Sequence, residues 1–188
     1  MSEIFNLKIP KQLRLPLLIL ALFPHLMVLS MFSMNATFTA SFLDLEADDL
    51  QFMFSMAYAT IVCGLFIHVR FFQFFNIRSY LLVMTGLSIL VLVAMTFTKN
   101  TQLLLILRFI QGPLTLFEGC ILIPLIMGQI TSKHAKIFAY SALYCFMMTG
   151  DKFATSILKF AIENYTYNMM LYTMIIFHAA ALLIYIFF

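Results

Sequence analysis

Residues 103–128 read LLLILRFIQGPLTLFEGCILIPLIMG, an apolar stretch long enough to cross a bilayer. Its polar members are Arg108, Gln111, Thr115 and Glu118, and the last three follow Arg108 by 3, 7 and 10 positions. These spacings place all four on one face of a single helix. Charged groups in a bilayer are expensive and usually line a pathway or pair with each other. This polar face is therefore the strongest indication of function in the chain.

The composition around this stretch is that of a membrane protein. Of the 188 residues, 63% are hydrophobic and 10% are charged, and the mean hydropathy is +1.01. A soluble domain is about half apolar and about a quarter charged. The fold class we expect is therefore all-α, with the helices forming one multi-pass transmembrane bundle. The net charge of +3 is too small to indicate a nucleic-acid partner.

Apolar runs separated by polar breaks predict six membrane helices, at about residues 14–38, 50–70, 79–98, 102–129, 136–160 and 166–188. Seven lysines and arginines fall on one side of this topology and two on the other. The first set is Lys8, Lys11, Arg14, Arg70, Arg78, Lys133 and Lys136, and the second is Lys99 and Lys159. This asymmetry predicts cytoplasmic N- and C-termini in a cell membrane, which we expect to be a bacterial inner membrane. The ending inside an apolar helix suggests a fragment, or half of a larger architecture.

Two further charged residues, Asp151 and Lys152, fall near the middle of the helix expected at 136–160. Their depth predicts pairing of Arg108 with Asp151 and of Glu118 with Lys152, which lowers the cost of burying each charge. Two interpretations stay open. The pairs are either a static brace between helices or part of a relay, because a buried carboxyl without a partner can carry a proton near neutral pH.

Several isolated polar residues are weaker candidates for the lining of a cavity. Each of them is either a cavity residue or a hydrogen-bonded packing residue. They are His25, Asn35, Tyr58 and Thr115. The remaining histidines, His68, His134 and His178, lie near membrane edges or alone and carry no functional prediction.

Enzyme and metal chemistry lack their minimum parts in this sequence. The three cysteines, Cys63, Cys120 and Cys145, form no C-x-x-C or Cys/His spacing. We find no Ser/His pair, His/carboxylate cluster or H-E-x-x-H motif. We therefore expect neither an enzyme nor a metal or cofactor site.

The stretch LRFIQG at residues 107–112 resembles the R-x-x-Q-G signature in the fourth helix of the major facilitator superfamily. Residues 35–60, NATFTASFLDLEADDLQFMFSMAYAT, and 97–112, FTKNTQLLLILRFIQG, are similar to the multidrug proton-antiporter branch. The resemblance covers most of residues 20–130. It implies the six-helix N-terminal half of a transporter whose substrate path lies between two such bundles.

Within this resemblance, Arg108 takes the role of the cavity arginine that helps to couple proton movement. Gln111 and Gly112 complete the motif. Two departures weaken the match. In VRFFQFFNIRS, residues 69–79, Gln73 and Asn76 replace the aspartate and the second glycine of the family's loop motif. The glycine- and proline-rich antiporter motif of the next helix is missing, and only Gly150 remains.

The function we predict is half of a proton-coupled secondary transporter that exports small amphipathic compounds. Its coupling residues are Arg108, Gln111, Glu118 and Asp151, with Lys152 as a partner. The expected partners are membrane lipid, protons, a small-molecule substrate and a second six-helix half, from the same gene, a separate chain or a second copy. The alternative is a non-transporting membrane interaction or scaffold protein derived from a transporter half.

Overall fold

The computed structural model describes residues 10–33, residues 76–187 and some single positions between 40 and 62. This part of the chain contains five long helices and no strand, so the all-α prediction is confirmed for it. The helices are α1 (Lys11–Ser33), α4 (Ile77–Thr96), α5 (Thr101–Gly128), α6 (Lys133–Asn164) and α7 (Tyr167–Phe187). Each begins within a few residues of a predicted helix. The helix predicted at 50–70 lies outside the described residues, apart from single positions.

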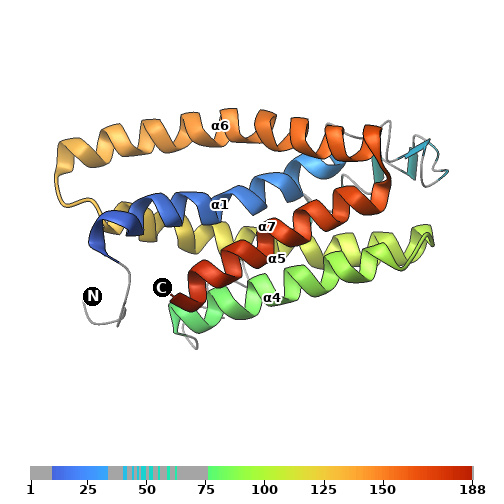
Figure 1. The fold of residues 1–188 in the computed structure, drawn as a ribbon, viewed down its shortest axis with the longest axis horizontal. Helices are drawn as coiled ribbons and strands as arrows, with labels where there is room; N and C mark the ends of the chain where they lie inside the picture. Colours follow the sequence, from blue (N-terminus) through green and yellow to red (C-terminus); the bar gives the residue numbers. More distant parts are fainter. Residues whose placement is uncertain are drawn as a thin grey trace.

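Side-chain caps mark the starts of α5 and α6, and short connections join the last four helices. The Asn100 side chain accepts a hydrogen bond from the Leu103 amide at 3.1 Å, at the start of α5. Ser132 accepts one from the Ala135 amide at 3.5 Å, at the start of α6. Such caps satisfy amide groups that have no partner inside the helix. Because the connections are only a few residues long, consecutive helices run antiparallel (Figure 1).

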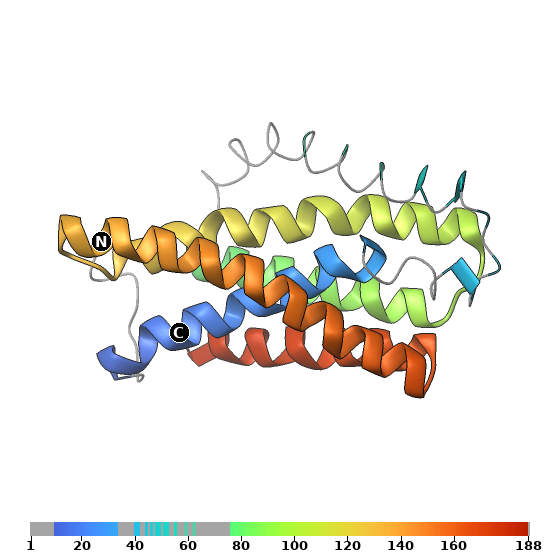
Figure 2. The ribbon, with the colours of Figure 1, turned by 90° about the horizontal axis from the view of Figure 1, so that it is seen from above.

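Helix α1 is central, since it packs against α5, α6 and α7, while α4 covers α5 and α7 (Figures 1 and 2). Two apolar clusters fill the interior. One lies around Met27, Leu92 and Met170, and the other around Leu18 and Leu122. At the far end of the second cluster, Arg78 of α4 donates a hydrogen bond to the carbonyl of Ile186 in α7.

Two of the described helices, α4 and α7, are long and apolar enough to cross a membrane, as judged by length and composition alone. The apolar part of α1, Leu13–Val28, is shorter than this limit. Helix α6 has the length, but it carries six charged residues and does not reach the same apolarity. Arg14, Arg78, Lys133 and Lys136 lie at the end of the bundle where α1 begins and α7 ends, whereas Lys99 and Lys159 lie near the opposite end.

Candidate functional site

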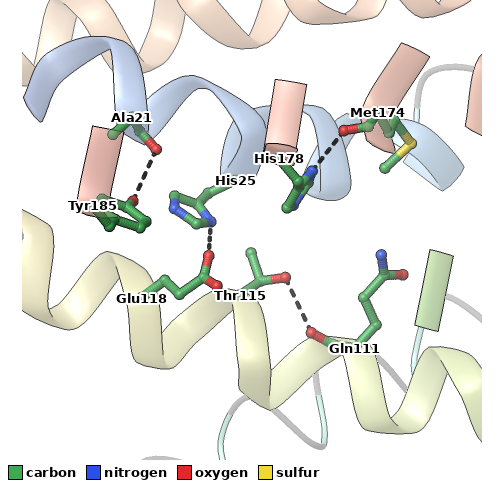
Figure 3. A network of polar contacts seen from close by, with 8 residues as sticks. All are labelled: Ala21, His25, Gln111, Thr115, Glu118, Met174, His178 and Tyr185. Atoms are coloured by element: carbon green, nitrogen blue, oxygen red, sulfur yellow. Dashed lines mark hydrogen bonds and ion pairs between the residues drawn. The ribbon is translucent and has the colours of Figure 1, made fainter. Parts of the chain in front are cut away.

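A polar layer separates the two apolar clusters where α1, α5 and α7 meet, and its centre is a pair formed by His25 and Glu118. Nδ1 of His25 in α1 lies 2.8 Å from Oε2 of Glu118 in α5 (Figure 3). The two side chains are 5% and 0% exposed. A carboxyl this deep depends on a nearby partner, because a charge alone in an apolar interior is very costly. The predicted pairing of Glu118 with Lys152 is therefore wrong.

The third member of this layer is His178 of α7. Its Nδ1 lies 2.8 Å from the carbonyl oxygen of Met174, and its ring stands edge-on to that of His25, with centroids 6.2 Å apart (Figure 3). A carbonyl oxygen only accepts, so Nδ1 of His178 carries the hydrogen and Nε2 is left as an acceptor in the neutral ring. Sequence reasoning missed this residue. Its position near the middle of the helix predicted at 166–188 is a weak signal, because it gives a depth in the membrane but no neighbour.

Gln111 and Arg108 lie about two and three turns before Glu118 on the same face of α5. Nη1 of Arg108 donates to Oε1 of Gln111 at 2.9 Å, and Nη2 donates to the carbonyl oxygen of Val28 in α1 at 3.3 Å. Both side chains are buried. The guanidinium is thus bound to α1, and the described residues contain no ion pair between Arg108 and Asp151. The predicted pairing of those two residues is also wrong.

The remaining residues of the polar face turn inward as well. Thr115 is buried, and its hydroxyl donates to the Gln111 carbonyl oxygen at 3.0 Å. Gly112 is buried inside α5 beside Gln111. The Tyr185 hydroxyl of α7 donates to the carbonyl oxygen of Ala21 in α1 at 3.4 Å (Figure 3). The polar face of α5 therefore meets α1 and α7 inside the bundle.

Asp151 and Lys152 lie apart from this layer on α6. Asp151 is half-buried and Lys152 is exposed, and neither forms an ion pair with any residue the structure describes. The buried residues of α6 instead include Gly150, Ala154 and Leu158, which form a stripe at helical spacing. Because α1 packs against both α5 and α6, the charged residues of α6 do not reach the polar face of α5.

Several buried polar atoms of the layer have no hydrogen-bond partner among the described residues. Among them are His25 Nε2, His178 Nε2, Gln111 Nε2 and Glu118 Oε1. Each such atom costs about 1–3 kcal/mol, so a cluster of them in an otherwise apolar interior is unusual. The described part of the chain holds no group of three His, Cys, Asp or Glu side chains arranged for a metal. A carboxyl paired with one imidazole, next to a second imidazole, is instead suited to holding and passing protons.

Two of the predicted cavity residues, Asn35 and Tyr58, lie outside the described residues. The other two, His25 and Thr115, are buried in the polar layer.

No model of a known protein family matches the chain, and no curated protein matches it. The resemblance to the major facilitator superfamily stays a prediction.

Proposed function

We propose that this chain is a transmembrane helical bundle that couples proton movement to the transport of small amphipathic compounds, as one half of a secondary transporter. The observation that carries this proposal is the buried His25–Glu118 contact, 2.8 Å long, at the centre of an apolar bundle. Ionisable residues inside membrane helices are rare and belong most often to ion and substrate pathways.

The outer surface supports a lipid environment. In the apolar segments of α4 and α7, 44% and 33% of the residues are buried, and the others are at least partly exposed on the outside of the described helices. Large side chains on this surface include Leu90, Phe97 and Ile176. In water such patches cause association, whereas lipid solvates them. The basic residues at one end, Lys133 and Lys136 among them, fit the cytoplasmic side of a membrane.

The pair is suited to coupling because its protonation controls a contact between two helices. With one proton between them, His25 and Glu118 attract each other either as an ion pair or as a neutral acid and base. A second proton neutralises the carboxylate and leaves a buried imidazolium without a counter-charge. That state is costly in an apolar interior, so it favours separation of α1 from α5. Proton uptake thereby biases the bundle toward a second conformation.

Arg108 supplies a second connection between the same two helices. Its guanidinium holds the Val28 carbonyl of α1, and its charge is permanent at physiological pH. In the proposed transporter the substrate path runs between this bundle and a second one, which a longer product, a separate chain or a second copy provides. Movement of α1 against α5 then changes the side of the bundle that faces this path.

The test uses the intact gene product in liposomes, with ethidium as the probe compound and an imposed pH gradient. We expect the gradient to drive ethidium movement in the unsubstituted protein. Glu118→Gln keeps the size of the side chain but removes its titration, and it should abolish this movement. The control is Glu163→Gln, because Glu163 is an exposed carboxyl in a surface pair with Lys159. Movement by Glu118→Gln at the unsubstituted rate would refute the mechanism.

A further inference from the structure

An apolar groove opens on the side of the bundle between the start of α1, the end of α5 and the start of α6. Its volume is about 380 Å³. Leu15 and Ile19 of α1 form one wall, and Ile126 lies at the end of α5. Phe138 and Ala142 belong to the α6 wall. Every residue that lines this groove is hydrophobic, so it is suited to an apolar occupant.

Phe146 lines the end of this groove that lies toward the middle of the bundle. Phe146 also lines a second apolar cavity of about 370 Å³, together with Leu20, Gly150 and Phe153. The first groove follows α6 from Ala135 to Phe146. Eleven helical steps correspond to about 16 Å at 1.5 Å per residue. One leaflet of a bilayer has a hydrocarbon depth of about 15 Å. The groove therefore has the length of a lipid chain that begins at the membrane surface.

Three basic residues lie in the helix ends that adjoin the end of the groove at that surface. Lys133 and Lys136 lie in the first turn of α6, and Lys136 shares a helix face with Ala139 in the groove wall. Arg14 directly precedes Leu15. Helix α1, the loop 129–132 and α6 up to residue 150 contain no acidic residue. The end of the groove is thus positively charged.

We propose that this groove binds an anionic phospholipid. One acyl chain lies along α6 between α1 and the end of α5, and the phosphate lies beside Lys133 and Lys136. Basic clusters at the cytoplasmic ends of membrane helices attract anionic lipids in this way. The inference depends on the membrane location proposed above, but not on proton coupling.

The test compares phosphatidylglycerol with phosphatidylcholine, each titrated onto the full chain purified in detergent, with bound lipid counted by native mass spectrometry. Removal of either lysine, by Lys133→Gln or Lys136→Gln, should weaken phosphatidylglycerol binding about fivefold, and removal of both roughly thirtyfold. Lys159→Gln is the matched control, because Lys159 lies near the opposite end of the same helix. It should leave binding unchanged.

A second variant tests the groove itself. Ala142 is exposed and lines the groove, so Ala142→Phe fills the space without disturbing the core. We expect Ala142→Phe to lose both lipids while its helical circular dichroism is unchanged. Equal affinity for the two lipids, or full binding by the double lysine variant, would overturn the proposal. So would a dimer that Ala142→Phe dissociates, because a second copy would then occupy the groove.

The test of lipid binding and the test of proton coupling can succeed or fail independently. The double lysine variant should retain ethidium movement that depends on Glu118, since neither lysine lies near the polar layer. Conversely, Glu118→Gln should bind phosphatidylglycerol as the unsubstituted protein does. Loss of lipid binding in Glu118→Gln would show that the bundle itself had changed, and would contradict the separation of the two sites.

Discussion

Two pairs of ionisable residues in the middle parts of the long helices, His25 with Glu118 and Asp151 with Lys152, have different surroundings. His25 and Glu118 belong to neighbouring helices and are buried 2.8 Å apart. Asp151 and Lys152 are neighbours in sequence on α6, half-buried and exposed, and form no ion pair within the described part of the chain. Depth along a helix therefore does not decide whether an ionisable side chain is paired. The face of the helix, and the helix opposite it, decide that.

Helix α1 produces this difference. It offers His25 and the Val28 carbonyl to α5, and it offers Leu26 to α6. On the α6 side the facing residue is Gly150, which has no side chain and permits close approach. Polar groups therefore meet on one side of α1, and apolar groups meet on the other.

The largest effect we expect is from His25→Leu, which removes one member of the buried pair. Glu118 is then left without its partner in an apolar interior, which costs about 3–5 kcal/mol in the free energy of unfolding. Chemical unfolding in detergent micelles, followed by circular dichroism, measures this loss. His134→Leu is the matched control, because His134 is exposed in the first turn of α6, and its effect should stay within about 0.5 kcal/mol.

The double variant His25→Leu/Glu118→Leu sharpens this prediction. Replacing a whole buried pair by apolar side chains is often neutral or even stabilising. We therefore expect the double variant to be more stable than His25→Leu alone, so that the two substitutions are not additive. Additive losses would mean that the two side chains act independently, and the pair would lose its place in the proposed mechanism.

Gly150→Ala should lower stability by a smaller amount, because it adds an atom to a tightly packed contact and removes no partner. A Cβ atom at this position would lie 2.7 Å from Cδ1 of Leu26, which is itself buried. Forcing the contact apart costs about 1–3 kcal/mol, whereas alanine gains about 1 kcal/mol in helix propensity over glycine. The thermal unfolding midpoint should therefore fall.

Gly86 of α4 provides the control for this substitution. Nothing lies within 4 Å of a Cβ atom built there, so Gly86→Ala should raise the midpoint through propensity alone. The two alanine substitutions are expected to have opposite signs. A rise in both would show that the Leu26 side chain moves aside at little cost.

The helices were largely predictable because long apolar runs, broken by short polar segments, specify them locally. The polar face of α5 was predictable for the same reason, since the spacing of Arg108, Gln111 and Glu118 is a property of one helix. All three side chains are buried, as their shared face requires. These parts of the structure can be predicted without knowing which helices are neighbours.

The partners of that face were not predictable, because they depend on how helices pack. Lys152 and His25 both lie at about the depth of Glu118, so depth alone does not select its partner. The position of α1 between α5 and α6 gives Glu118 a contact with His25 and not with Lys152. His178 was overlooked because α7 has no other charged residue to suggest a site. Its role appears only when its ring is found beside that of His25.

The smallest effect is expected from Asp151→Asn and Lys152→Gln, where the sequence predicted coupling residues. Because these side chains are half-buried and exposed, without an ion pair among the described residues, each substitution should change the free energy of unfolding by less than about 0.5 kcal/mol. Ethidium movement in liposomes should also persist in both variants, in contrast to Glu118→Gln. Loss of movement by Asp151→Asn at unchanged stability would contradict this expectation. It would assign Asp151 a place on the substrate path between the two bundles. A carboxyl at that surface can face the second bundle, so it needs no partner within this one.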